Sequence, residues 1–289
     1  MPADSAATQT VSGLDELELA PPARRDLPRL GRRFWKSLWP KLLAIGLVIG
    51  AWEAVVLSGW RPEYQLPGPL PVARELVDQV TQASFWDSVA LTMTRAATGF
   101  LLAVVIGTLL GAAVARFAPL RAAIGSLITG LQTMPSIVWF PMAILLFQLS
   151  ESSILFVVVL GAAPSVANGL IAGIDYVPPA WRRVGQVLGM RGIGLYRHLI
   201  LPACLPSFVS GLKQGWAFAW RSLMAGELLV VVPGALSIGV RLQGARELSD
   251  APLLLSYVII ILIIGIMVDL VFGAVDSAIR RRWGMKAAG

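Results

Sequence analysis

The feature that most restricts this chain is a series of long apolar segments separated by short polar ones. A helix that crosses about 30 Å of hydrocarbon needs about 20 apolar residues. Six segments reach this length, and none shows the alternation typical of β-barrels. They lie near 41–60, 88–116, 119–148, 152–175, 206–232 and 252–279. The sequence therefore predicts an all-α integral membrane protein with six transmembrane helices.

Basic residues predict how these helices are oriented, because Lys and Arg are enriched in cytoplasmic loops. With the N-terminus inside, the inner segments hold seventeen of the 24 Lys and Arg residues. The outer segments hold four, which are Arg61, Arg74, Arg241 and Arg246. We therefore expect both termini in the cytoplasm. The same topology accounts for the net charge of +7 without any nucleic-acid partner.

The composition of the ends and of the connections predicts the domain organisation. Residues 1–40 are polar and basic and lack the apolar core of a secretion signal, so we expect a disordered cytoplasmic tail that can touch anionic lipid headgroups. Residues 41–282 form the six-span domain, and 283–289 form a cytoplasmic C-terminal tail. The first outer connection, 61–87, contains proline turns followed by an amphipathic pattern that predicts a short interfacial helix.

Small residues recur at a spacing of four, which lets helix backbones approach closely. The pairs are Gly46 and Gly50, Gly107 and Gly111, Gly169 and Gly173, and Gly211 and Gly215. They predict a packed helical bundle without identifying which one.

The longest inner loop, residues 176–205, is basic and rich in helix-breaking residues. Pro178 and Pro179 suit the start of a short helix that ends at Gly189. The stretch "GLYRHLILP" predicts a second helical turn that stops at Pro202. Two short helices outside the lipid would present Arg, Tyr and His side chains to a cytoplasmic partner.

The spacing within this loop resembles that of the permease subunits of ATP-binding-cassette importers. Their cytoplasmic motif reads EAA, three residues, Gly, nine residues, then I-x-L-P. Here Gly189 is followed after nine residues by "LILP", 199–202. The EAA positions are occupied by "RVG", 183–185, a departure that also occurs in the nitrate, sulfonate, taurine and bicarbonate subfamily. "LQTMPSIVWFPMAILLF" and "MAGELLVVVPGALSIGVRLQGARE" are similar to segments of that subfamily, although Phe147-Gln148 replaces its usual Phe-Gly pair.

The resemblance implies a type I ABC importer permease fold in a bacterial inner (plasma) membrane. It also implies a second permease copy as a homodimer, two ATPase subunits that bind ATP and Mg, and an extracytoplasmic substrate-binding protein. The solute would be small and anionic, of the sulfonate or taurine, nitrate or bicarbonate type. The ATPase-coupling loop would use Arg182, Arg183, Gly185, Gly189, Arg191, Tyr196, Arg197, Leu201 and Pro202.

Charged residues inside a membrane are costly and are therefore candidates for function. Arg221 lies deep in the fifth span and, with Arg95, would give the pathway a positive field for an anion. Lys213 lies near the inner face, where it can simply reach the interface. Asp269 can pair with Arg221 or with Arg95. The pathway candidates are Arg95, Met134, Pro135, Trp139, Trp220, Arg221 and Glu227.

The prolines of the third span either shape a gate or produce a packing kink, and the sequence leaves both open. No enzyme signature, ATP-binding motif or metal cluster is expected in this chain. Cys204 and His198 are the only residues of their kinds. Two other functions remain open at this stage. They are an ion-coupled secondary transporter and a membrane scaffold or sensor that does not transport.

Overall fold

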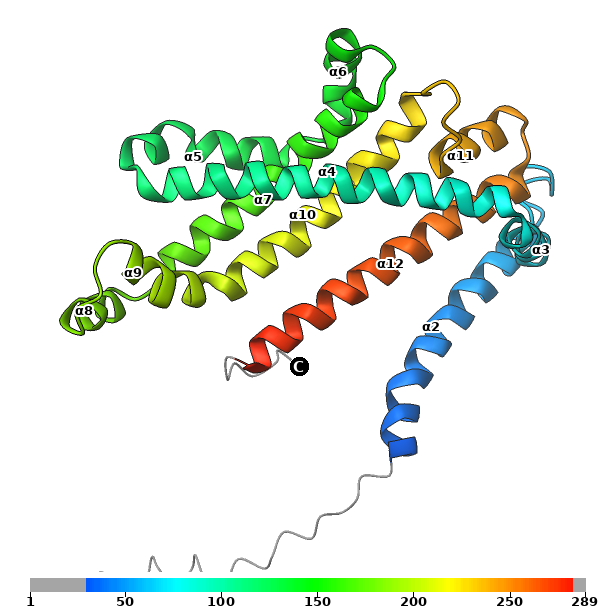
Figure 1. Cartoon of the computed structure of the whole chain (residues 1–289). Helices are drawn as coiled ribbons and strands as arrows, with labels where there is room; N and C mark the ends of the chain where they lie inside the picture. The colour runs from blue at the N-terminus through cyan, green and yellow to red at the C-terminus, as the bar shows by residue number, and fades with distance from the viewer. Residues whose placement is uncertain (1–29, 283–289) are drawn as a thin grey trace, which may run out of the picture. The chain divides into compact units, whose positions relative to one another are not determined.

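The protein is described here by a computed structural model over residues 30–282, and the chain divides into two units. The first unit ends at Ser58 and contributes helix α2, Leu30–Leu57 (Figure 1). The prediction of a disordered tail is wrong for residues 30–40, which are helical. Several of them are Leu, Arg and Lys, which have high helix propensity. The predictions for residues 1–29 and 283–289 lie outside the described residues.

The second unit begins at Gly59, and its described part consists of helices joined by short loops. Its elements are α3 (Pro69–Thr81), α4 (Ala83–Arg116), α5 (Ala118–Thr133), η1 (Ser136–Trp139), α6 (Phe140–Phe147), α7 (Glu151–Asp175), α8 (Pro179–Val187), α9 (Ile193–Leu195), η2 (Tyr196–Ile200), α10 (Leu201–Leu229), α11 (Ile238–Glu247) and α12 (Ala251–Arg282).

The described helices support a membrane protein but not a count of six uniform spans. Residues Leu38–Leu57, α4, α7 and α12 are each long and apolar enough to cross a bilayer. Helix α5 together with η1 and α6 meets the same test as one bent pair, which gives up to five. Helix α10 is 29 residues long but carries three charged residues and is not among them.

The third predicted span is broken rather than straight. Its two halves, α5 and the segment Ser136–Phe147, are bent by 104° relative to each other. The break falls at Met134, whose backbone is extended (φ −75°, ψ 131°). The following residue is Pro135, and proline disfavours the helical conformation of the residue before it. The proline therefore ends one helix, and a new one begins at Ser136.

The short amphipathic helix predicted within residues 61–87 is present as α3. Its Val72 and Gln79 are buried. The Tyr257 hydroxyl of α12 donates a hydrogen bond of 2.7 Å to Gln79 Oε1. This bond ties the amphipathic helix to the bundle.

Helix α7 is the central helix of the second unit and packs against α4 and α10 through small residues. A Cβ added at Gly169 would lie 2.6 Å from the Cα of Gly211, and one at Gly107 would lie 2.5 Å from the Ala163 carbonyl oxygen. These approaches are possible only without side chains. The small-residue pairs on α4, α7 and α10 are thereby confirmed as packing positions.

Candidate functional site

The segment between α7 and α10, which we call the elbow (residues 176–202), lies at one end of these two helices, while α6 and α11 lie at their opposite ends (Figure 1). Helix α8 begins with Pro179 in its first turn. Arg182 Nη2 donates a hydrogen bond of 2.9 Å to the Ile174 carbonyl in the last turn of α7. A basic side chain at a helix C-terminus satisfies a free carbonyl and complements the helix dipole. The elbow is therefore fastened to the bundle.

A tight glycine turn separates the two halves of the elbow. Gly189 has φ +82° and Gly192 has φ +52°. Both values lie in the left-handed region that glycine adopts without steric cost. The prediction that Gly189 permits a sharp turn is confirmed. Gly185 is buried, and a Cβ there would lie 2.8 Å from a methyl group of Leu195, so α8 folds closely back on α9.

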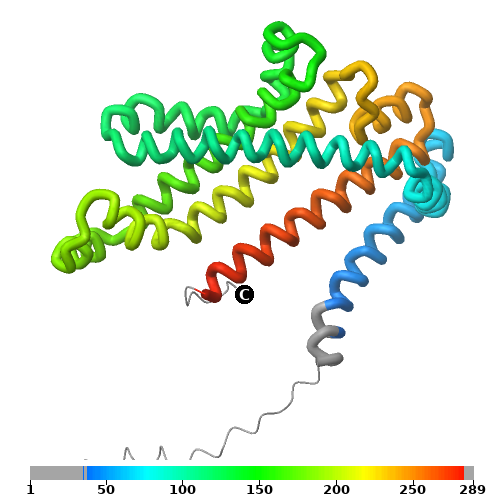
Figure 2. The backbone as a smooth tube through the Cα atoms, viewed as in Figure 1, coloured from blue at the N-terminus to red at the C-terminus, as the bar shows by residue number. Residues whose placement is uncertain are grey.

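The second half of the elbow differs from the prediction, because Pro202 does not stop a helix. The backbone continues from α9 through η2 into α10 without a break (Figure 2). Pro202 lies in the first turn of α10. The preceding turn is a π-helix, in which the Leu201 N–H bonds to the Tyr196 carbonyl five residues back. The proline, which lacks an N–H, falls where the helical register changes. Force on the elbow would therefore pass directly into α10.

The elbow exposes both apolar and basic side chains. Val187 is 88% exposed and Ile193 is 86% exposed. Such exposed apolar side chains mark a protein interaction surface when they are clustered. Arg183, Arg191 and Arg197 are exposed, as are Tyr196 and Leu201, while Arg182 and Pro202 are half-buried. All nine predicted coupling residues lie in this one segment.

A buried charge network joins α4, α7 and α10. Arg95, only 4% exposed, pairs with Glu151 through Nε and Nη2 and with Glu227 through Nη1 at 3.0 Å. Glu227 is fully buried, and it also accepts hydrogen bonds from Thr92 Oγ1 and, at 3.0 Å, from the Gly239 N–H. Gly239 lies in the first turn of α11, where a carboxylate is favourable. The network therefore fastens α11 to the bundle.

Sequence reasoning identified Arg95 and Glu227 but not the partnership between them, and it missed Glu151. The partners are 132 and 56 residues from Arg95 along the chain, so no local spacing connects them. The predicted pairing of Asp269 with Arg221 or Arg95 is not observed. Asp269 instead pairs with Lys213 at 3.2 Å.

A cavity lies beside the break in the third span, and we call it the inner cavity. It has a volume of about 410 Å³. Its lining includes Met134 and Pro135, and Gln132, Thr133, Ser136 and Arg221 supply its polar groups. Arg221 Nε donates to the Ala217 carbonyl at 3.0 Å, and the guanidinium lies 4.8 Å from the Phe218 ring. No other partner of this guanidinium is found among the described residues.

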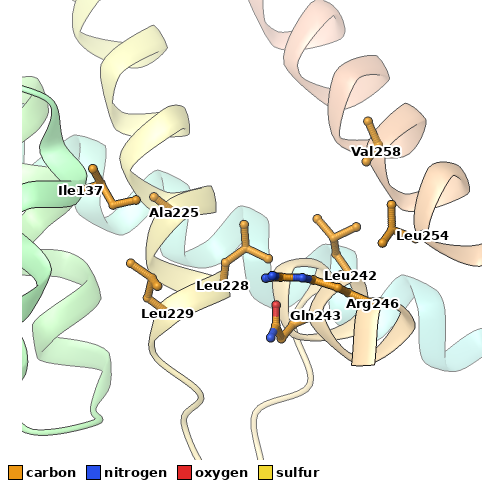
Figure 3. A pocket seen from close by; sticks show the side chains of 9 residues that line it. All are labelled: Ile137, Ala225, Leu228, Leu229, Leu242, Gln243, Arg246, Leu254 and Val258. Carbon is orange, nitrogen blue, oxygen red and sulfur yellow. The ribbon is translucent and has the colours of Figure 1, made fainter. Parts of the chain in front are cut away.

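A second cavity, of about 420 Å³, lies between α10, α11 and α12 (Figure 3), and we call it the outer cavity. Gln243 and Arg246 supply its polar groups, and the Arg246 side chain extends from α11 toward Leu228. The remaining lining is aliphatic and consists of Ile137, Ala225, Leu228, Leu229, Leu242, Leu254 and Val258. Sequence reasoning placed Arg246 in an outer loop and did not assign it to a site.

Four predicted pathway residues line neither cavity: Arg95 and Glu227, which belong to the buried charge network, and two tryptophans. Trp139 packs against the main apolar core, and Trp220 stacks on Trp216 with ring centroids 6.4 Å apart. Both therefore contribute to packing in this conformation.

Residues 90–281 match the model of a family described as the binding-protein-dependent transport system inner membrane component. The chain belongs to this family. Three relatives illustrate the range of solutes. The taurine transport system permease protein TauC of Escherichia coli is 26% identical, with 84% of this chain and 91% of the relative covered. The bicarbonate transport system permease protein CmpB of Synechococcus elongatus is 27% identical (83% and 90%). The nitrate import permease protein NrtB of Leptolyngbya laminosa is 23% identical (86% and 90%).

Solved transporters share the fold at lower identity. The methionine ABC transporter MetNI in an inward-facing conformation matches with a TM-score of 0.54 and 17% identity, covering 72% of this chain and 98% of that one. A bacterial alginate ABC transporter, in complex with its alginate-bound periplasmic protein, also gives 0.54, at 14% identity, covering 86% and 98%. The family match identifies the protein as the membrane-embedded permease subunit of an ABC importer, and these structures show that it shares their fold. Subunits of this family carry out the transport of a solute across the membrane, while a separate ATPase subunit hydrolyses ATP.

Proposed function

We propose that this permease carries a small anionic solute and that its elbow is the contact through which a partner ATPase drives transport. In this assignment both termini and the elbow lie in the cytoplasm, and α11 lies on the outer side. The charge distribution supports it, since positive residues are retained on the cytoplasmic side. ATP and Mg are bound by the ATPase, and a binding protein delivers the solute from outside.

The observation that carries the coupling role is the construction of the elbow. Its apolar surface protrudes at one end of the bundle, and Arg182 fastens it to α7. The same segment continues into α10. A partner that moves the elbow therefore moves α10, which carries Arg221. Transport driven by a partner requires a continuous element of this kind between the partner's contact and the helices of the pathway.

We also propose that the permease forms a homodimer, which would account for polar residues on the membrane helix α10. Ser210, Gln214 and Arg221 are exposed on α10. Their spacings of four and seven residues place them along one face. A face with these groups is unfavourable against lipid, because polar side chains in membranes are directed to the bundle interior or to a water-filled cavity. A second copy would enclose this face and form an aqueous pathway.

The anionic solute is supported by two arginines at cavities. Arg221 and Arg246 each line a cavity, and neither is paired with a carboxylate among residues 30–282. Arg95 does not serve in this way in the present conformation, because two carboxylates surround it. We therefore assign the positive field of the pathway to Arg221, with Met134 and Pro135 beside it as candidates for the gate.

The coupling role is tested by removing the apolar contacts of the elbow. We expect Val187→Ser combined with Ile193→Ser to abolish co-purification of the ATPase, with the thermal stability of the permease unchanged. Leu248→Ser is the matched control, because Leu248 is 78% exposed at the C-terminal end of α11, far along the chain from the elbow. Retention of the ATPase by the double variant would contradict the proposal. Transport driven by an ion gradient without ATP would replace it with a secondary transporter.

A further inference from the structure

The two cavities share a wall. Ile137 and Ala225 line both of them. Beyond this wall the cavities differ in chemistry. The outer one has a single cationic group, Arg246, in an aliphatic lining, whereas the inner one places Arg221 beside polar side chains of the broken span. Each cavity therefore offers one guanidinium, and an aliphatic barrier lies between them.

The outer guanidinium is available for a ligand. No hydrogen bond or ion pair of the Arg246 guanidinium occurs within the described part of the chain. Its neighbour Gln243 already donates its amide to Glu247 Oε1 at 3.0 Å. Arginine is the side chain best suited to hold a carboxylate or sulfonate through two hydrogen bonds.

The aliphatic lining restricts which anion fits. A small inorganic anion is hydrated on all sides, and a cavity with one cationic edge replaces only part of that hydration. An organic anion has one charged end and one apolar end. Its head would meet Arg246 while its tail would lie against Leu228, Leu242 and Leu254, which is the usual division of polar and apolar groups in ligand sites.

The inner cavity can receive the same head. Gln132, Thr133 and Ser136 supply hydrogen-bonding groups next to Arg221.

We propose that the outer and inner cavities are successive binding sites for an organic anion with an apolar tail, whose charged head passes from Arg246 to Arg221 across the barrier of Ile137 and Ala225. This inference rests on the proposed function and narrows its solute class. The barrier is where the path would be closed between the two sites.

The test is binding of a permanently charged probe to the full-length permease in nanodiscs. Hexanesulfonate is titrated against wild type, Arg246→Ala, Arg221→Ala and the control Arg74→Ala, which alters an exposed outer cation outside both cavities. We expect saturable binding that Arg246→Ala weakens by at least about tenfold, because the substitution removes both hydrogen bonds to the charged head. Affinity should rise about fourfold for each methylene added to the tail. Arg74→Ala should bind like wild type.

Three results would overturn the inference. Equal binding of hexanol would show partition into lipid rather than recognition of the head. Equal competition by nitrate would remove the role of the tail. An unchanged affinity in Arg246→Ala, or no saturable binding because a second copy fills the cavity, would remove the outer site. The ATPase activity of the assembled importer is measured in the same variants. If the ATPase associates normally while binding fails, this inference is wrong and the proposed coupling function stands.

Discussion

The buried network around Arg95 gives the most demanding prediction. Replacing Arg95 with Leu removes its bonds to Glu151 and Glu227 together. The two carboxylates respond differently. The Glu151 side chain is 45% exposed and can regain other polar contacts, whereas Glu227 is fully buried and keeps only Thr92 and the α11 backbone.

The size of the effect follows from this asymmetry. Leaving one buried charge without its partner costs about 3–5 kcal/mol. Glu227→Gln alone should cost about 1–3 kcal/mol, because Arg95 keeps Glu151 and the amide oxygen still accepts from Gly239. The double variant removes both charges, so it should be more stable than Arg95→Leu alone. We therefore expect that adding Glu227→Gln to Arg95→Leu raises the free energy of unfolding.

The assay is unfolding in mixed micelles by titration with SDS, followed by tryptophan fluorescence, for the wild type, both single variants and the double variant. Their free energies of unfolding form a double-mutant cycle. If the two losses simply add, or if Arg95→Leu unfolds like the wild type, Arg95 does not hold Glu227 in the way described.

Three further predictions concern other contacts. Gly169→Ala and Gly211→Ala should each lower the free energy of unfolding by at least about 1–3 kcal/mol, because the added Cβ meets rigid backbone. Gly125→Ala should leave it unchanged, because the space around Gly125 is open, and equal effects at all three positions would refute the close packing. Arg241→Ala should lower the free energy of unfolding by about 1–3 kcal/mol, because Arg241 donates to Ser88 Oγ at 2.7 Å and to the Ser84 carbonyl at 2.8 Å. Limited proteolysis should then cut near α11 more readily, and an unchanged cleavage pattern would argue against this anchor. Gly189→Ala should destabilise the elbow by about 1–2 kcal/mol through its left-handed backbone and lower ATPase coupling while leaving the bundle stable, and wild-type coupling would show that the turn is not required.

Much of the architecture was predictable because membrane helices carry their signal locally. Apolar length located most spans, and glycine spacing located the contacts of α7 with α4 and α10. The short helix after Pro179 and the turn at Gly189 also followed from local rules. Each of these features depends on residues within a few positions of one another.

The features that were not predicted depend on contacts between distant segments. The 104° break at Met134 and Pro135 was read only as a choice between a gate and a kink. The π turn before Pro202 lets a helix continue where the proline rule predicted an end. Glu151 and Arg246 acquire their roles only when distant helices meet, so neither stood out from its sequence neighbours.

Accessibility and cross-linking of the elbow test the central claim most directly. Val187→Cys in a Cys204→Ser background places a single thiol on the apolar surface of α8. The account predicts that a membrane-impermeant thiol reagent labels it only from the cytoplasmic side, and that it cross-links to a cysteine in the partner ATPase with a yield that changes when ATP binds. Labelling from the outer side, or an elbow that cross-links to nothing in the assembled importer, would contradict it.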